Sequence, residues 1–204
     1  TYQTNTDTSL RFLIYAEDST QTTGDGVSGI YINGVSDEIG SYPTSYIPTN
    51  GQTETRLADV CEGGGDESTF NDSEGTLYYE LSAFEDTINR TIDFKDENND
   101  NNILVRIGSD GFLYFFVRVG GTLIISTNWS GLEQTDNNKI AVKYSSSGYD
   151  VYVNGVKRLT GTNSISFINN INEIRILSFP SNFKALAYFP EALTDTELQE
   201  LTTI

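Results

Sequence analysis

Alternating apolar and polar residues dominate this chain, and the clearest run of them covers residues 139–159. Apolar side chains occupy every second position on either side of residues 145–148. A period of two places alternate side chains on opposite faces of a β-sheet. Residues 145–148 are small and polar, which predicts a four-residue hairpin loop. Asn154-Gly155 predicts a type I′ turn, because both of its central residues must adopt positive φ. The segment is therefore expected to form three antiparallel strands with one buried face.

Further strand patterns follow one another from residue 75 onward, with turns rich in Gly, Asn and Asp between them. They cover residues 75–84, 89–96, 102–119, 123–129, 163–168, 171–179 and 183–189. Within 112–119 both alternating sets are largely apolar, which predicts a central strand covered on both faces. This spacing of short strands predicts an all-β sandwich of the jelly-roll type.

One short helix is predicted at the C-terminal end of the chain. Thr194 and Glu197 have the three-residue spacing of a capping box. Leu193, Leu198 and Leu201 then form an apolar stripe that can pack on the sandwich.

The first third of the chain has a different character. Apolar runs within residues 1–48 predict the end strands of an upstream β-sandwich or β-extension. Residues 49–65 predict an extended connector, because Pro48 lies just before them and three consecutive glycines lie at their end. The jelly roll is expected over residues 66–204. Since the chain begins at Thr1 and contains no Met, we expect it to be part of a longer or processed protein.

Composition excludes several classes of function. The net charge of −17 argues against nucleic acid and anionic membranes as partners, because both are bound through basic side chains. The absence of His removes Ser-His, Cys-His and His-metal chemistry. A single Cys leaves no internal disulfide, and no apolar run is long enough for membrane insertion.

Three stretches carry a resemblance to a known family. They are DGFLYFFV at 110–117, the turn Tyr152-Val153-Asn154-Gly155, and LTDTELQEL at 193–201. With the strand pattern around them, they make residues 66–204 resemble the laminin G / concanavalin A-like lectin–glucanase jelly roll. The resemblance implies a jelly-roll sandwich that ends in a short helix.

A second resemblance lies in the segment before the jelly roll. Residues 40–59, GSYPTSYIPTNGQTETRLAD, are similar to a segment common in bacteriophage tail and fibre proteins. This similarity implies a virion location with other virion proteins as partners. Phage fibres are often homotrimers, although no residue here requires one.

Glycoside hydrolysis is the enzymatic alternative for this fold. It requires two carboxylates about 5–10 Å apart beside a cleft, and glucanases of this fold carry them at alternate positions of one strand. Glu80 has no acidic residue two positions later, and Glu85 and Asp86 are adjacent, so they point in opposite directions. We therefore expect no enzymatic activity, with a glycan depolymerase as the alternative.

No cofactor is required by the sequence, but one loop invites comparison with a calcium site. Asp96, Asn98 and Asp100 alternate in DENNDNN, and such oxygen ligands suit Ca²⁺. An EF-hand loop would need Gly and Glu where the chain has Asn101 and Ile107. A solvated turn is the alternative interpretation, and we favour it over a rim calcium site.

Glycan binding is the function that the remaining residues suggest. Aromatic rings stack on sugar faces while Asn side chains bind hydroxyls. The candidates are four residues. Trp129 and Asn128 lie at a strand end, and Tyr144 and Tyr152 lie in the central hairpin. The same aromatic residues could instead pack the sandwich. The hypothesis is a non-enzymatic virion module that binds host-surface carbohydrate, and the alternative is a structural or decorating virion protein.

Overall fold

The computed structural model describes residues 46–48, 50, 52, 54, 61–84, 87–167, 171–177 and 181–204. The chain divides into two compact units, Thr1–Glu54 and Thr55–Ile204. Nearly all of the first unit lies outside the described residues, so the upstream strands within 1–48 stay a prediction. The second unit contains the predicted jelly roll.

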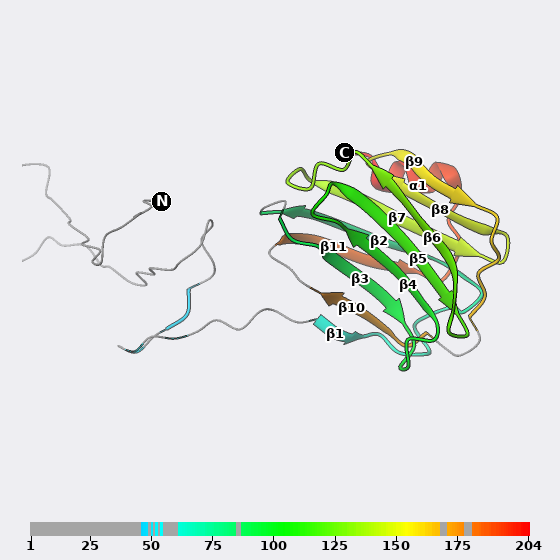
Figure 1. The fold of residues 1–204 in the computed structure, drawn as a ribbon, viewed down its shortest axis with the longest axis horizontal. Coiled ribbons are helices and arrows are strands. Elements are labelled where there is room, and N and C mark those ends of the chain that lie inside the picture. Colours follow the sequence, from blue (N-terminus) through cyan, green and yellow to red (C-terminus); the bar gives the residue numbers. More distant parts are fainter. Residues whose placement is uncertain are drawn as a thin grey trace, which may run out of the picture. The chain divides into compact units, whose positions relative to one another are not determined.

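Two antiparallel sheets pack face to face in the second unit (Figure 1). The six-stranded sheet has the order β1 (Cys61–Gly64), β10 (Glu173–Leu177), β3 (Arg90–Lys95), β4 (Asn102–Ile107), β5 (Phe112–Val119), β6 (Thr122–Ser130). The five-stranded sheet has the order β11 (Ser181–Phe189), β2 (Glu74–Ala83), β7 (Asn138–Ser145), β8 (Gly148–Val153), β9 (Val156–Gly161). The helix α1 (Asp195–Thr202) follows. This arrangement confirms the all-β jelly-roll sandwich with one short C-terminal helix.

The connector predicted over residues 49–65 ends earlier than expected. Cys61–Gly64 forms strand β1, which pairs antiparallel with β10 at the edge of the six-stranded sheet. An edge strand needs hydrogen-bond partners on one side only, so even a glycine-rich run can join the sheet there.

The core lies between the two sheets. Leu113, Phe115 and Val117 on the inner face of β5 are fully buried in one cluster with Val142 and Tyr149. The Phe115 and Tyr149 ring centroids are 4.8 Å apart, so this contact joins the two sheets directly. The inner face of β5 therefore contributes to the largest apolar cluster of the unit.

The central meander of residues 139–159 forms as predicted, with one difference. Asn154 and Gly155 have φ values of 51° and 76°, as the type I′ turn requires. Ser145 pairs with Gly148 across β7 and β8, so only two residues connect these strands instead of four. Gly148 itself has a φ of 138°, which L-residues rarely adopt, and this allows the tighter turn.

The outer face of β5 departs from the prediction. Phe112, Tyr114, Phe116 and Arg118 are only partly buried, so the expectation that both faces of this strand are covered is wrong. Among the described elements, α1 is the one that packs on an outer face, and it contacts β7, β8 and β9 of the other sheet. A largely apolar strand face is thus left accessible.

Helix α1 is fixed at its start and along its apolar side. Thr194 and Glu197 form the predicted capping box, which satisfies backbone N–H groups of the first turn. Leu198 is fully buried, and the predicted stripe of Leu193, Leu198 and Leu201 packs in a cluster of its own. Within the described part of the chain, no helix has the length and apolar character needed to cross a membrane.

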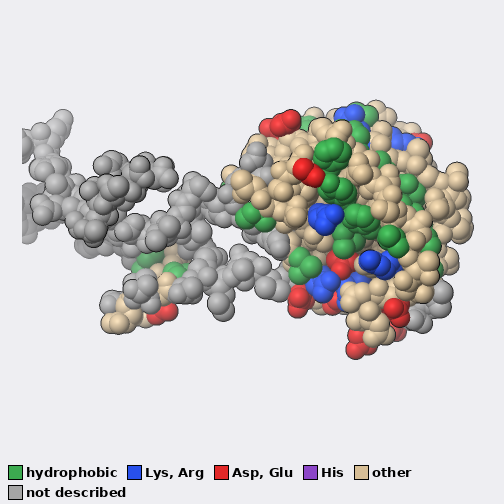
Figure 2. Space-filling model, in the orientation of Figure 1, with side chains coloured by type: hydrophobic (Ala, Val, Ile, Leu, Met, Phe, Trp, Pro, Cys, Tyr) green, Lys and Arg blue, Asp and Glu red, His purple; other side chains and the backbone are tan. Residues whose placement is uncertain are grey.

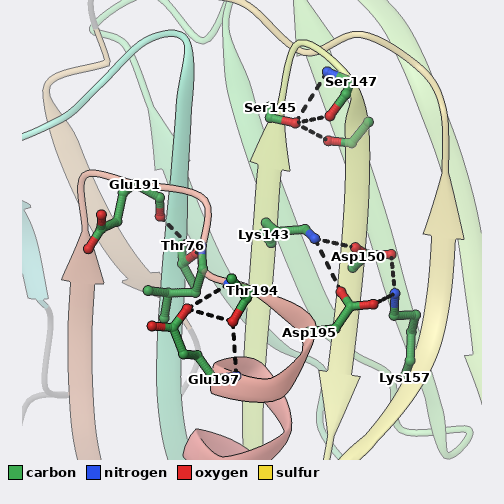
Figure 3. Close-up of polar contacts among 12 residues, drawn as sticks. Thr76, Lys143, Ser145, Ser147, Asp150, Lys157, Glu191, Thr194, Asp195 and Glu197 are labelled. Atoms are coloured by element: carbon green, nitrogen blue, oxygen red, sulfur yellow. Dashed lines mark hydrogen bonds and ion pairs between the residues drawn. The ribbon is translucent and has the colours of Figure 1, made fainter.

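Four charged residues hold the start of α1 on the five-stranded sheet (Figure 3). Lys157 Nζ lies 2.8 Å from Asp195 and 3.2 Å from Asp150, and Lys143 Nζ lies 2.6 Å from Asp150 and 3.4 Å from Asp195. The hydrogen bond from Lys157 holds the pKa of the Asp195 carboxyl below its ordinary value. This network ties the first turn of α1 to β7, β8 and β9.

Thr194→Ala is expected to lower the free energy of unfolding by about 1 kcal/mol, because it removes the cap of α1. Thr196→Ala is the matched control, since Thr196 is exposed on the same helix and Ala favours helix. Urea unfolding followed by tryptophan fluorescence measures both variants. Equal midpoints for the two variants would contradict a stabilising role for the capping box.

Candidate functional site

The outer face of the six-stranded sheet carries its side chains in rows, because the strands lie in register. One row contains Thr91, Arg106, Tyr114 and Asn128 from β3, β4, β5 and β6. Residues two positions along each strand belong to the neighbouring rows. Figure 2 shows hydrophobic and basic side chains gathered over the middle of this face.

Three aromatic side chains form a line along β5. The rings of Tyr114 and Phe116 are parallel to within 4°, with centroids 6.1 Å apart. Phe112 extends the line, with its centroid 6.0 Å from that of Tyr114. All three are partly exposed, so their rings offer apolar surface to a ligand.

Arg106 lies across this line from the neighbouring strand. Its guanidinium carbon is 4.7 Å from the centroid of the Tyr114 ring and 5.5 Å from that of Phe116. A guanidinium at these distances is attracted to the negative face of an aromatic ring. We call Arg106, Phe112, Tyr114, Phe116 and Asn128 the aromatic platform.

The turn between β4 and β5 fixes the position of Tyr114. The Tyr114 hydroxyl donates a 2.6 Å hydrogen bond to Asp110, and this bond lowers the pKa of Asp110 and raises that of Tyr114. A Cβ atom at Gly108 would lie 2.9 Å from the Tyr114 ring, so only glycine leaves room for the ring here. The hydroxyl and the ring face are thus held in one orientation.

Buried polar side chains flank the platform on the β3 side. Arg175 makes a 2.7 Å ion pair with Asp93, whose other oxygen accepts a 3.3 Å hydrogen bond from Asn102. Among the described residues, three buried atoms of this face have no hydrogen-bond partner: Asn102 Oδ1, Arg106 Nε and Arg175 Nε. Unpaired buried polar atoms are costly, and native proteins retain few of them.

A polar hollow of about 390 Å³ adjoins the Phe112 end of the platform. Its lining comes from the β4–β5 turn and from the chain after β6: Ser109, Asp110, Gly111, Ser130, Gly131, Leu132, Glu133, Gln134 and Thr135. Ser130 is paired with Phe112 across β5 and β6, which places the hollow next to the last ring of the platform.

The sequence-predicted sugar residues do not come together. Asn128 belongs to the platform, where it is paired with Tyr114. Trp129 is paired with Leu113 and packs against the core, and Arg158 lies 4.5 Å over its ring. Trp129 therefore points to the opposite face of β6 from Asn128.

The two predicted tyrosines have no exposed ring face. Tyr144 is fully buried in the main core, and its hydroxyl donates to the Asn71 carbonyl at 2.5 Å. Tyr152 is 5 % exposed and packs in the cluster beneath α1 with Leu198. The prediction that Tyr144 and Tyr152 bind sugar is therefore wrong, because a sugar cannot stack on a covered ring. Both residues pack the sandwich instead.

The loop considered for calcium is held together by its own hydrogen bonds. Asp96 is buried and accepts hydrogen bonds from the backbone N–H groups of Asp100 and Asn101 and from the Asn101 side chain. Asn98 and Asp100 are exposed. No group of three or more Cys, Asp or Glu suited to a metal ion occurs in the part of the chain described here. The solvated turn is the interpretation that these contacts favour.

Sequence reasoning placed the aromatic residues of the platform on one strand face but treated that face as covered. Two arginines could have indicated that the face is accessible. Arg118 lies on the same face of β5, and Arg106 lies at an outward position of the adjacent strand β4. An Arg guanidinium is rarely buried without a carboxylate partner, so these residues pointed to an accessible face.

Comparison with solved structures reveals the same fold in carbohydrate-binding modules. The CBM40 module of Ruminococcus gnavus IT-sialidase, solved with α2,3-sialyllactose, matches with a TM-score of 0.54 and 16 % identity, over 72 % of this chain and 96 % of the module. Leech intramolecular trans-sialidase matches with the same score and identity, over 72 % of this chain and 27 % of that protein.

A receptor binding domain also matches, with a TM-score of 0.51 and 16 % identity over 63 % of this chain and 34 % of that one. No family model and no curated protein matches the sequence. At such low identity the likeness concerns the fold. The chain contains a jelly-roll sandwich with the same fold as these carbohydrate-binding modules.

Proposed function

We propose that this protein is a non-enzymatic glycan-binding module whose site is the aromatic platform. The observation that carries the proposal is the pair of parallel, partly exposed rings of Tyr114 and Phe116 beside the Arg106 guanidinium. Sugar rings stack on such surfaces, while a few placed polar groups bind their hydroxyls. The fold shared with a sialyllactose-bound module supports the same function.

The state of the carboxyl groups supports a non-enzymatic role. A glycosidase acid needs a raised pKa beside a second, ionised carboxylate. In the described part of the chain, every carboxyl whose pKa departs from its ordinary value departs downward: Asp66, Glu80, Asp110, Asp150, Asp195 and Glu197. Beside the platform, Asp93 is already paired with Arg175.

We further propose that the module belongs to a bacteriophage particle and attaches it to host-surface carbohydrate. The support is the resemblance of residues 40–59 to a segment of phage tail and fibre proteins. Each shallow site would bind weakly, and display of many copies on one particle would raise the overall avidity.

Tyr114→Ala is expected to weaken glycan binding about tenfold or more, because it removes the central ring of the platform. A glycan array identifies the ligand, and calorimetry measures its affinity for each variant. Leu186→Ala is the matched control, since Leu186 is an exposed apolar residue of β11 on the other sheet.

Tyr114→Phe separates the ring from the hydroxyl. It keeps the stacking surface and removes only the hydrogen bond to Asp110, so most of the affinity should remain. If the folded wild-type protein bound none of the glycans, including carbohydrate from host cells, the proposed function would be wrong. If Tyr114→Ala bound as tightly as Leu186→Ala, the site would lie elsewhere.

A further inference from the structure

The outer face of the six-stranded sheet differs in charge from the rest of the chain. Six charged side chains occupy outward positions on β10, β3, β4 and β5: Lys95, Arg106, Arg118, Arg175, Asp93 and Glu173. Four are basic and two acidic, which gives the outward positions of these four strands a summed charge of +2 in a chain whose net charge is −17. A local positive field on an acidic protein selects for anionic ligands.

Pairing within the face leaves two of its arginines without a carboxylate. Lys95 pairs with Glu173 at 2.7 Å, and Arg175 pairs with Asp93 at 2.7 Å. Arg106 and Arg118 make no ion pair with any residue that the structure describes. The charge of Arg106 helps to lower the pKa of Asp110. That carboxylate already accepts a hydrogen bond from the Tyr114 hydroxyl.

Arg106 and Arg118 bracket the aromatic line. Arg106 lies in the row of Tyr114, whereas Arg118 lies in the row of Asn102, four residues further along β5. Four residues of strand span about 13 Å, which exceeds the width of a single sugar ring. Phe116 lies between the two rows, so an oligosaccharide along β5 would meet a guanidinium, a ring and a second guanidinium in turn.

We infer that the ligand of the platform is an acidic oligosaccharide, bound through its carboxylate groups by Arg106 and Arg118. The inference rests on the proposed glycan-binding function and adds the charge class of the sugar. A guanidinium offers a planar pair of donors that matches a carboxylate. The rings of Tyr114 and Phe116 hold Arg106 in place, which reduces the entropy lost when it binds a ligand.

Neighbouring polar atoms fit the hydroxyl groups of such a sugar. Asn128 lies beside Tyr114 in the same row and is exposed. Asn102 is 2 % exposed, and its Oδ1 atom has no partner in the described part of the chain. Asn102 is paired with Arg118 across β4 and β5, so this acceptor lies in the same row as the second proposed carboxylate contact.

The test compares acidic glycans with their neutral counterparts. The probes are sialyllactose against lactose, trigalacturonic acid against its methyl ester, and sulfated lactose to separate sulfate from carboxylate. The wild-type chain is expected to bind the acidic member of at least one carboxylate pair tenfold or more tightly than its neutral counterpart. This preference should decrease as NaCl is raised from 50 to 500 mM, because salt screens charge pairs.

Three charge-removing variants locate the preference. Arg106→Gln and Arg118→Gln should each reduce the acidic-to-neutral affinity ratio about tenfold. Lys184→Gln removes the same charge from β11 on the other sheet, where Lys184 is exposed, and should leave the ratio unchanged. Circular dichroism establishes that each variant is folded.

The outcomes separate this inference from the proposed function. Neutral sugars that bind as tightly as acidic ones would overturn the charge assignment and leave glycan binding in place. A preference for the sulfated sugar alone would overturn the carboxylate assignment. An acidic preference unaffected by either arginine variant would overturn the site. Absence of binding to every probe and to host carbohydrate would overturn both proposals.

Discussion

Phe115→Ala is expected to lower the free energy of unfolding by about 3–5 kcal/mol, whereas Phe116→Ala is expected to cost about 1 kcal/mol. The two residues are adjacent on β5 but point to opposite faces. Phe115 is fully buried and contacts Tyr149 of the opposite sheet, so its truncation leaves a cavity. Phe116 is partly exposed and stacks on Tyr114, so water can fill the space that its ring leaves.

Urea unfolding of both variants measures this difference, and glycan binding supplies a second readout. A domain is stable by only about 5–15 kcal/mol, so Phe115→Ala would remove a large share of that stability. Phe116→Ala should stay folded but bind glycan more weakly. Similar losses of stability for the two variants would mean that a further layer covers the outer face of β5.

Alkaline pH is expected to destabilise the protein strongly above about pH 10. Burial raises the pKa of Tyr79 well above its ordinary value. Burial, followed by the hydrogen bond with Tyr188, raises that of Tyr144. In the unfolded chain both phenols ionise near pH 10, while in the folded chain they keep their protons. Stability is therefore fully present below pH 10 and is lost as the pH rises toward the folded pKa values.

Each such tyrosine is expected to cost about 1.4 kcal/mol of stability per pH unit above 10. Because the two contributions add, both tyrosines together are expected to give a slope of about 2.8 kcal/mol per pH unit. Unfolding free energies measured in urea between pH 8 and 12 give the slope. A flat profile across this range would contradict the burial of both hydroxyls.

Two conservative variants separate the two tyrosines at neutral pH. The Tyr79 hydroxyl is buried without a hydrogen-bond partner among the described residues, so Tyr79→Phe should stabilise the protein by about 1 kcal/mol at pH 7. Tyr144→Phe loses the bond to the Asn71 carbonyl and should destabilise it by about the same amount. Both variants should reduce the alkaline slope by about 1.4 kcal/mol per pH unit.

The meander and the helix followed from local rules, which is why the sequence predicted them. The positive φ angles at Asn154 and Gly155 are a property of that dipeptide in a hairpin. The capping box of Thr194 and Glu197 needs only residues of one helical turn. Alternation along residues 139–159 likewise depends on the strand alone.

The site depended on pairing between distant strands, which the sequence does not reveal. Arg106 meets Tyr114 only because β4 and β5 are in register, and a shift by one residue would place them on opposite faces. Asn128 lies on the outer face beside Tyr114, whereas its neighbour Trp129 lies on the opposite strand face. Tyr144 and Tyr152 could not be assigned to the main core or to the cluster beneath α1 without knowledge of which layers cover each sheet.

The strand order has a consequence for synthesis of the protein on the ribosome. β10 lies between β1 and β3, and β11 pairs with β2, so both sheets need strands from the last part of this unit. Until residue 177 has emerged β3 lacks its neighbour β10, and until residue 189 has emerged β2 lacks its neighbour β11. Their edges are meanwhile open to pairing with other nascent chains. Folding of this unit can therefore be completed only once β10 and β11 have left the ribosome, and its yield should depend on chaperones that shield those edges.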